Sequence, residues 1–190
     1  EAKGLVLSSH ISPTTPYLLY GDPHHLRQVF INLIGNAIKF TSKGNIDLKV
    51  STIDEDAKKA ELRFEVSDTG IGIPLDAQND IFNSFTQADT STTRKYGGTG
   101  LGTTISKQIV ELMGGKIDLH SVPDVGSTFW LQIPFTKQEN VMPASDSQAL
   151  SKLNILILST NTNTNIDESL SIWGINYAMT DSPISAIKKL

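Results

Sequence analysis

A long amphipathic helix is predicted between residues 22 and 41. Asp22 and Pro23 mark its start, because an aspartate can accept hydrogen bonds from the free amides of a first helical turn and a proline there has no amide to lose. Apolar side chains then recur at steps of three and four residues: Leu26, Val29, Phe30, Leu33, Ile34, Ala37 and Ile38. That spacing puts them on one face of a helix of about five turns, which must therefore pack against a second layer.

Two antiparallel hairpins are predicted, one at 46–66 and one at 117–133. In both, apolar residues alternate with polar ones on each side of a charged or turn-forming centre. Alternation with a period of two buries one face of each strand and leaves the other towards solvent. Two shorter extended segments, at 5–9 and 17–20, precede the long helix.

Two further helices are predicted between the hairpins. A short one passes through residues 81–85, and a longer one begins near Leu101 and ends at Gly114-Gly115, because glycine is common just beyond a helix end. Residues 86–99 between them are nearly all polar or glycine and lack periodicity, so we expect a mobile loop.

The C-terminal part is predicted to be a separate, truncated unit. A strand at 155–158, a helix at 166–173, a strand at 175–179 and the start of a helix at 182–190 follow one another. This βαβα order implies a parallel sheet with crossover helices, but two strands are too few for a sheet core. The predicted division is 1–136 for the first domain, 137–151 for a polar linker and 152–190 for the second unit.

Bulk properties narrow the classes of partner. The formal charge of −4 provides no electrostatic attraction to nucleic acid or an anionic membrane. The absence of cysteine excludes disulfides, thiolate metal sites and cysteine nucleophiles. The apolar run at 153–158 is too short to cross a bilayer, and no signal peptide opens the chain. We expect a soluble, cytoplasmic fragment without direct membrane contact; a parent protein anchored in the inner membrane elsewhere is compatible with this.

The predicted long helix carries a second stripe, opposite its apolar face. Gln28, Asn32 and Asn36 recur at four-residue steps and Lys39 follows three residues later, so all four share one side. A solvated surface is the usual reason for such a stripe, although solvated helices favour Glu, Lys and Arg over amides. The alternative is a magnesium and phosphate site, because amide oxygens are hard neutral ligands and a lysine one turn on can neutralise phosphate charge.

The segment from Asp68 to Ile73, with sequence DTGIGI, directly follows a predicted strand. One interpretation is an Asx turn whose two glycines adopt positive φ. The other is a base-binding site, in which a buried carboxylate accepts a hydrogen bond from the amine of adenine while the glycines let the base approach the backbone. The pattern alone leaves both open.

Four glycines within the six residues 97–102 run directly into the helix predicted from Leu101. Exposed amides and a helix N-terminus form a cradle for phosphate, and Arg94 and Lys95 add positive charge. The alternative is a flexible linker, which would not lead so abruptly into an apolar periodicity. The Lys-Ser/Thr ending of a Walker loop is missing, and a polar loop rather than a strand precedes the glycines, unlike a dinucleotide-binding fingerprint.

Five short segments, in order, resemble the sequence boxes of the GHKL ATPases in their histidine-kinase version. They are NLIGNAIKF at 32–40 (N box), DTGIG at 68–72 (G1 box), FNSF at 82–85 (F box), GTGLG at 98–102 (G2 box) and GSTF at 126–129 (the last, GTxF-type box). The resemblance covers about residues 3 to 135, and the stretch 85–100 is especially similar to hybrid sensor kinases. It implies an α/β two-layer sandwich of the GHKL (Bergerat) type: a mixed, mainly antiparallel sheet covered by three helices, with ATP between the N-box helix and a lid.

The resemblance also implies roles for the matching residues of the long helix. Asn36 would hold Mg²⁺ through its amide oxygen, with Asn32 and Lys39 on the phosphate side. Phe40 would flank the nucleoside, and Arg94 or Lys95 would reach the γ-phosphate from the lid. Asn36, Lys39 and Arg94 are therefore the residues expected to act in phosphoryl transfer.

The remaining matches would form the adenine pocket and the lid. Asp68 would bind the amine of adenine with Thr128 nearby, and Gly70, Gly72 and Ile73 would shape the pocket. The residues expected to close over the phosphates are Tyr96, Gly98, Thr99, Gly100, Leu101 and Gly102. Two departures stand out: Thr103-Thr104 replace a common Leu-Ala, which should not prevent binding, and Asn83-Ser84 replace the usual Glu-Pro of the F box.

The resemblance favours phosphoryl transfer over hydrolysis. Hydrolases of the superfamily place a glutamate four residues before the magnesium asparagine as the general base for water, and Asn32 occupies that position here. An amide cannot accept a proton at neutral pH, so in-line transfer of the γ-phosphoryl group to another nucleophile is expected. In the family that nucleophile is a histidine on a separate dimerisation domain. An ATP-sensing pseudokinase without transfer activity is the alternative.

None of the four histidines fits the role of phosphoacceptor. His24 and His25 fall in the first turn of the long helix without a following acidic residue, and His10 and His120 fall on predicted strands. The chain also lacks room for a helical hairpin before its first strand. We therefore expect the acceptor domain to lie upstream, outside this fragment.

The C-terminal segment resembles the start of a receiver domain, which would make the parent a hybrid kinase with a receiver or response regulator as its downstream partner. Ser159, Thr160 and Asn161 occupy the place where a working receiver has an acidic pair. Without carboxylates there the segment cannot bind magnesium, so we expect a degenerate or truncated receiver. A fortuitous βαβα order is the alternative.

Overall fold

The structure is a computed structural model that describes residues 3–83, 101–138, 152–158, 166, 170–171 and 174–187, without the side chains of residues 186 and 187. The chain divides into two compact units, Glu1–Gln138 and Glu139–Leu190, each described by itself.

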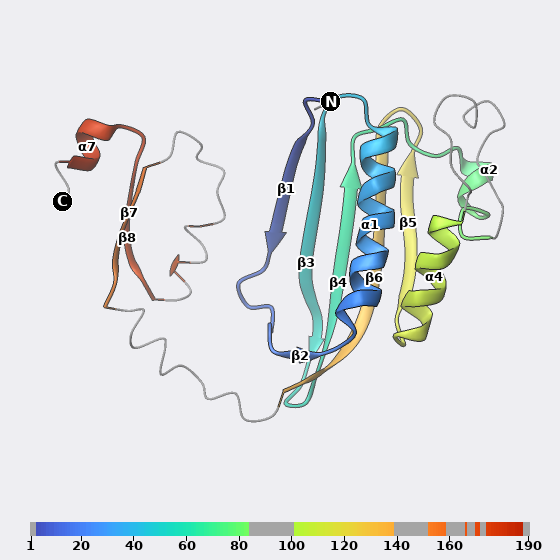
Figure 1. Ribbon diagram of the computed structural model, residues 1–190, viewed down its shortest axis with the longest axis horizontal. Coiled ribbons are helices and arrows are strands. Elements are labelled where there is room, and N and C mark those ends of the chain that lie inside the picture. The colour runs from blue at the N-terminus through green and yellow to red at the C-terminus, as the bar shows by residue number, and fades with distance from the viewer. Residues whose placement is uncertain are drawn as a thin grey trace. The chain divides into compact units, whose positions relative to one another are not determined.

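A six-stranded sheet organises the first unit (Figure 1). Its strands are β1 (Val6–Ile11), β2 (Leu19–Tyr20), β3 (Asn45–Glu55), β4 (Lys59–Asp68), β5 (Lys116–Val122) and β6 (Gly126–Lys137). The strand order is β1-β3-β4-β6-β2, and β5 pairs with β6 over the part of β6 that β2 leaves free. β1 runs parallel to β3 and the other pairs are antiparallel, which confirms the predicted mixed, mainly antiparallel sheet.

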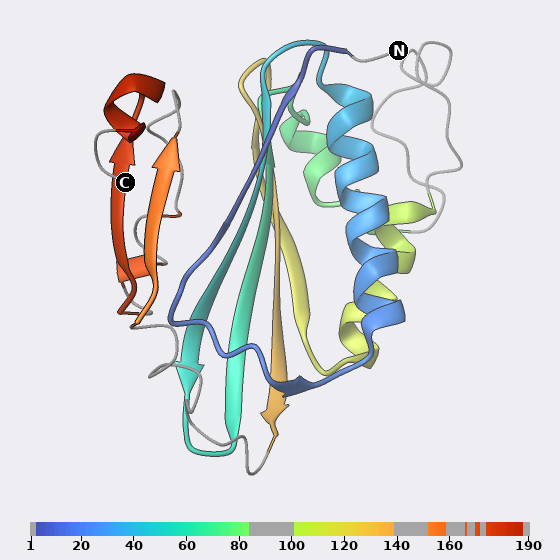
Figure 2. The ribbon, with the colours of Figure 1, turned by 60° about the vertical axis from the view of Figure 1, so that its left-hand side comes forward.

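Among the residues that the structure describes, three helices accompany this sheet, and Figure 2 shows α1 and α4 side by side on one of its faces. They are α1 (Pro23–Phe40), α2 (Leu75–Gln78) and α4 (Gly102–Leu112). The carboxylate of Asp22 caps α1 by accepting hydrogen bonds from the amides of His24 and His25, at 2.8 and 3.1 Å, as its position predicted. Gly114, with φ of 76°, follows the end of α4 in the left-handed conformation that glycine adopts at low cost.

The core lies between these helices and strands β3, β4 and β6. Phe64 of β4 packs edge-on against Phe30 of α1 and Phe135 of β6, with ring centroids 5.6 and 6.3 Å apart. Alternate residues of each strand point towards the helices, as the period of two predicted. The buried apolar residues are Val29, Leu33, Ala37, Ile46, Val50, Ala60, Leu62, Phe64, Val66, Val110, Phe129, Leu131, Ile133 and Phe135.

The short helix lies earlier than predicted. It spans Leu75–Gln78, directly after Pro74, whereas Ile81 and Phe82 lie in turns and Phe85 is outside the described residues. Phe82 still packs edge-on against Phe129, with centroids 6.2 Å apart. The apolar side chains in this stretch therefore reach the core from turns, and their spacing did not require a helix.

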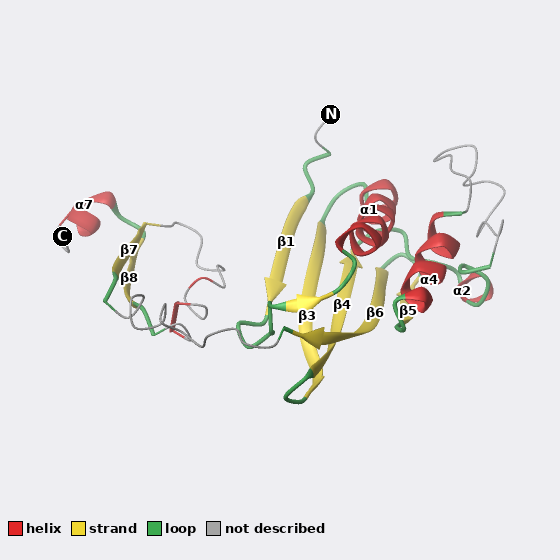
Figure 3. Cartoon of the chain, turned by 60° about the horizontal axis from the view of Figure 1, so that its bottom comes forward, coloured by secondary structure: helices red, strands yellow, loops and turns green. Residues whose placement is uncertain are grey.

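The second unit contains a two-stranded parallel sheet, coloured yellow in Figure 3, formed by β7 (Asn154–Leu158) and β8 (Asn176–Thr180). The helix α7 (Pro183–Ile187) follows β8. Leu170 and Ile175 are the buried apolar residues of this unit within the described ranges. The predicted parallel pairing is confirmed, and most of the predicted linker, residues 139–151, lies outside the described residues.

Within the part of the chain that the structure describes, no helix combines the length and apolar character needed to traverse a bilayer.

Candidate functional site

Asp68 lies at the end of β4, on the face of the sheet that the helices cover. It pairs with Ile46 of β3 and with Ser127 of β6, in the central part of the sheet. Its Oδ1 accepts a hydrogen bond from the amide of Gly70 at 2.8 Å, which confirms the predicted Asx turn. Burial raises the pKa of the Asp68 carboxyl, and the amides of Gly70 and Ser127 and the hydroxyl of Thr41 lower it by less. Asp68 is therefore a half-buried carboxyl group at the edge of the core, and its pKa is higher than that of an ordinary aspartate.

Thr128 does not lie beside Asp68, contrary to the prediction. Side chains alternate between the two faces of a strand, and Asp68 is directly opposite Ser127, so those two share a face. Thr128 points to the opposite face, where its hydroxyl is 2.9 Å from that of Ser67. Ser127, 8% exposed, is therefore the hydroxyl-bearing residue next to Asp68.

A buried hydroxyl network holds the turn after Asp68, and no local sequence pattern predicted it. Ser121 of β5 is 2.9 Å from the hydroxyl of Ser127 and accepts a hydrogen bond from the amide of Ile73 at 2.8 Å. Gln78 of α2 donates to the carbonyl oxygens of Ile73 and Ser121 at 2.7 and 3.0 Å. The backbone of Ile73 is thus held by hydrogen bonds, and Gln78 connects α2 to both the turn and β5.

Gly70 and Gly72 are required by contacts within the protein. A Cβ at Gly70 would lie 2.7 Å from the carbonyl oxygen of Phe40 and 2.8 Å from Oδ1 of Asp68. A Cβ at Gly72, where φ is 67°, would lie 2.2 Å from the carbonyl oxygen of Val122. Without side chains, these two glycines let the turn approach closely the backbone at the end of α1 and the backbone of the β5–β6 hairpin.

The end of α1 contacts the turn that carries Asp68. The carbonyl oxygen of Phe40 accepts a hydrogen bond from the amide of Ile71 at 3.4 Å. On the polar stripe of α1, Nζ of Lys39 lies 4.8 Å from the centroid of the Phe40 ring. Asn36, one turn earlier, is half-buried and makes no side-chain hydrogen bond within the described ranges. The fold therefore brings Asn36, Lys39 and Phe40 towards the same end of the sheet as Asp68.

Asn32 lies on the same stripe but contacts α4. Its Nδ2 donates to the carbonyl oxygen of Gly102 at 3.2 Å and to Oγ of Ser106 at 3.3 Å. Leu101 and Gly102 therefore lie next to the stripe, at the start of α4. The other predicted lid residues, Arg94, Tyr96, Gly98, Thr99 and Gly100, lie outside the described residues.

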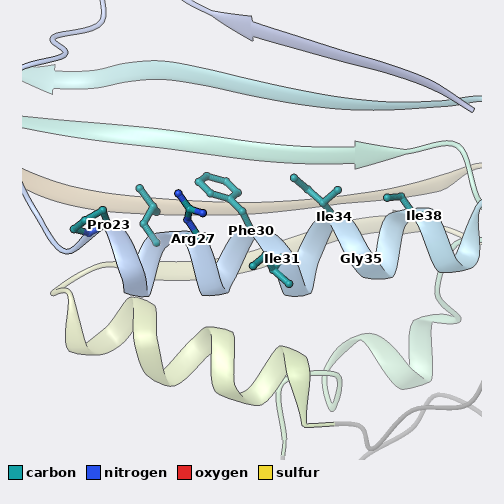
Figure 4. A pocket seen from close by; sticks show the side chains of 8 residues that line it. Pro23, Arg27, Phe30, Ile31, Ile34, Gly35 and Ile38 are labelled. Atoms are coloured by element: carbon teal, nitrogen blue, oxygen red, sulfur yellow. The ribbon is translucent and has the colours of Figure 1, made fainter.

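An apolar groove of about 590 Å³ follows a different side of α1 (Figure 4). Its lining residues are Pro23, Leu26, Arg27, Phe30, Ile31, Ile34, Gly35 and Ile38. None of the residues predicted to bind ATP or magnesium belongs to it, and Arg27 is the one charged residue among those that line it. The groove and the polar stripe are therefore separate features of the same helix.

Comparison with known proteins places this fold and these segments in one family. The profile of the family described as "Histidine kinase-, DNA gyrase B-, and HSP90-like ATPase" matches residues 21–137, which include α1, the Asp68 turn and the start of α4. The chain belongs to this ATPase family. The match confirms the resemblance on which the predicted fold was based.

The relatives narrow the family to its histidine-kinase branch. The chain is 47% identical over 137 residues to the sensory/regulatory protein RpfC of Xanthomonas campestris pv. campestris, covering 70% of the chain and 19% of that protein. It is 45% identical over 140 residues to the signal transduction histidine-protein kinase BarA of Escherichia coli (strain K12), covering 74% and 15%. The first unit is thus a histidine-kinase-type ATPase domain, and the chain spans less than a fifth of either curated relative.

A solved structure is similar over nearly the whole chain. The crystal structure of full-length ShkA in complex with AMPPNP matches with a TM-score of 0.64 at 30% sequence identity, covering 98% of this chain and 37% of that one. This agreement confirms the α/β fold. The match to the ATPase family is what identifies the first unit as an ATP-binding domain.

Proposed function

We propose that this chain binds Mg²⁺-ATP and donates the γ-phosphoryl group to a histidine on a separate dimerisation domain, as part of a hybrid sensor kinase in a phosphorelay. The observation that carries the proposal is the junction of the α1 end with the Asp68 turn, where the carbonyl of Phe40 accepts from the amide of Ile71. This junction brings the half-buried carboxylate of Asp68 to the same end of the sheet as Asn36 and Lys39 on the polar stripe of α1.

Asp68 would recognise the adenine base of ATP through a hydrogen bond. Its Oδ1 already accepts from the amide of Gly70, and a carboxylate has about four acceptor positions, so Asp68 could also accept from the amine of adenine. Ser127 supports this arrangement in the place predicted for Thr128, since it faces the same side as Asp68. Gly70, Gly72 and Ile73 would shape the pocket by keeping the turn tight, and Phe40 would flank the nucleoside.

The residues of α1 fit a magnesium ion that is held mainly by the nucleotide. Asn36 offers a neutral oxygen ligand, and among the described residues no group of three His, Asp or Glu side chains forms a metal cage. Magnesium commonly keeps several waters and binds through a few protein oxygens together with substrate phosphates, which matches this donor set. Lys39 would neutralise phosphate charge, and Arg94 and the other lid residues would complete the site from the segment outside the described residues.

The residues of the site favour transfer of the γ-phosphoryl group over hydrolysis of ATP. Asn32 has no basic oxygen that could activate water, and its amide nitrogen is already engaged with α4. The protein's part in transfer is to position ATP and to offset charge at the γ-phosphate, with the incoming histidine supplying the nucleophile.

The acceptor would come from another domain. His24 and His25 stand in the first turn of α1, where Nδ1 of His25 lies 3.0 Å from Oδ2 of Asp22, and His10 and His120 lie on β1 and β5. The parallel β7–β8 pair supports a receiver-like second unit, which would place a receiver or response regulator downstream; Ser159, Thr160 and Asn161 lie outside the described residues.

Two measurements test this function. Calorimetry with a non-hydrolysable ATP analogue should show binding that is strengthened by Mg²⁺. The fragment should then label a dimerisation domain of the parent kinase, added in trans with radiolabelled ATP, on histidine. Binding without labelling would identify an ATP-sensing module, and steady phosphate release by the isolated fragment would identify a hydrolase.

A further inference from the structure

The first turn of α4 is held from two sides by side-chain hydrogen bonds. On one side, Nδ2 of Asn32 donates to the carbonyl oxygen of Gly102 and to Oγ of Ser106, at 3.2 and 3.3 Å. On the other, the hydroxyl of Thr103 donates to the carbonyl oxygen of Ile81 at 2.6 Å. Ser106 is fully buried and Thr103 is 9% exposed, so these bonds are shielded from water.

These contacts place the amide nitrogen of Asn32 against α4, whereas the sequence predicted that Asn32 would lie on the phosphate side of the site. Its amide nitrogen carries two hydrogens, and both are directed at α4. Its oxygen lies 3.5 Å from Nε2 of Gln28. Since Ser106 is fully buried, it cannot itself touch a nucleotide, and its bond to Asn32 can act on one only indirectly, through the positions of Asn32 and α4.

We propose that Asn32, Ser106 and Thr103 form a polar clamp, whose function is to position the start of α4 against α1 and thereby set the geometry of the triphosphate site. The proposal rests on the proposed function. Asn36 and Lys39 lie on α1, while Leu101 and Gly102 lie at the start of α4, so groups that would face the phosphates come from both helices. Small displacements of positioning groups are costly in phosphoryl transfer, because catalysis depends on alignment.

The Thr103-Thr104 pair provides a matched test of the clamp. Both threonines are buried, at 9% and 8% exposure, in the first turn of α4. Thr103 donates to Ile81, whereas Oγ1 of Thr104 has no hydrogen-bond partner within the described ranges. Thr103→Val and Thr104→Val thus make the same chemical change at adjacent buried positions, and only the first breaks the clamp.

The experiment compares an ATP analogue with adenosine for each variant. Thr103→Val should weaken binding of the Mg²⁺-ATP analogue by about five- to tenfold, the usual value of one buried hydrogen bond, whereas Thr104→Val should change it less than about twofold. Under the proposed function adenosine would contact only the base end near Asp68, so it should bind both variants like the wild type in an NMR titration. A general loss of structure would weaken both ligands, so equal losses for adenosine and the analogue would overturn the proposal.

A double-mutant cycle tests the other side of the clamp. Ser106→Ala should weaken analogue binding in the wild type and have little further effect when Asn32 is already alanine, because the two residues act through one bond. Additive effects of Asn32→Ala and Ser106→Ala would show that Asn32 contacts the nucleotide independently, which contradicts the clamp.

Hydrogen exchange separates this inference from the proposed function. The amides of Ile105 and Ser106, in the first turns of α4, should exchange faster in Thr103→Val than in Thr104→Val, with or without nucleotide. Absence of analogue binding by the wild type would refute the proposed function, while equal exchange in the two variants would refute the clamp.

Discussion

Oδ1 of Asp68 accepts a hydrogen bond from the amide of Gly70 at 2.8 Å, so the turn that follows β4 is built on the same carboxylate that would read the base. The carboxylate therefore serves the fold, and its remaining acceptor positions would serve the ligand. The turn and the recognition site therefore cannot be altered independently, and the first two predictions concern this residue.

Asp68→Asn should weaken binding of an ATP analogue by about 10- to 100-fold, because a hydrogen bond to a charged acceptor is lost. The amide oxygen can still accept from Gly70, which keeps the turn and leaves an NH₂ group facing the amine of adenine. Isothermal titration calorimetry checks this, with Ser67→Ala, on the other face of the sheet, as the control. Unchanged affinity of Asp68→Asn would contradict the assignment of the base site.

The same residue should make stability depend on pH. Burial raises the folded-state pKa of Asp68 above its ordinary value of 3.8, so in the interval above 3.8 the folded protein binds more protons than the unfolded chain. The contribution of Asp68 to the free energy of unfolding therefore falls as the pH rises through that interval and is constant above it. In urea unfolding from pH 4 to pH 7, the free energy of unfolding of the wild type minus that of Asp68→Asn should fall as the pH rises. A difference that does not change with pH would contradict the raised pKa of Asp68.

Asn36→Ala should remove most of the gain in ATP-analogue affinity that Mg²⁺ provides, because the amide oxygen is the proposed protein ligand of the ion. Asn36→Asp keeps an oxygen ligand and should retain Mg²⁺-dependent binding while slowing phosphoryl transfer to the dimerisation domain. Calorimetry with and without Mg²⁺ measures the first effect and radiolabel transfer the second. A full Mg²⁺ effect in Asn36→Ala would place the metal elsewhere.

Gly35→Ala should raise the free energy of unfolding by about 0.5–1 kcal/mol, because alanine has the higher helix propensity. Gly35 lies inside α1 and a Cβ there would meet no atom within 4 Å. Urea denaturation measures the change, and analogue binding should be unaffected. Destabilisation by this substitution would show that the side of α1 facing the groove is more crowded than the structure indicates.

Gly72→Ala should lower the free energy of unfolding by more than about 2 kcal/mol, since it combines backbone strain with a collision. The residue has φ of 67°, and a Cβ would lie 2.2 Å from the carbonyl oxygen of Val122. The thermal unfolding midpoint should fall clearly below that of the wild type. A midpoint equal to that of Gly35→Ala would mean that the turn can rearrange without cost.

Much of the architecture could be predicted from local patterns. The start of α1 at Asp22-Pro23 and the alternation in β3, β4 and β6 depend on residues a few positions apart, and all appear as expected. The resemblance to the ATPase boxes also points to Asp68 and Asn36 as candidate site residues, because each box is a short contiguous segment that can be recognised without its neighbours in space. The short helix was misplaced, since apolar residues in turns can mimic a helical spacing.

Local sequence patterns were enough to predict most of the helices and strands, the family and the candidate residues, because periodicity, capping and box motifs are properties of short stretches. Which side chains meet depends on how the elements pair and pack: strand pairing put Ser127 rather than Thr128 beside Asp68. It also joined Asn32 to Gly102 and Ser106, 70 and 74 positions along the chain. Hydrogen-bond partners far apart in sequence are brought together by the register of strands and the packing of helices, which no local pattern encodes.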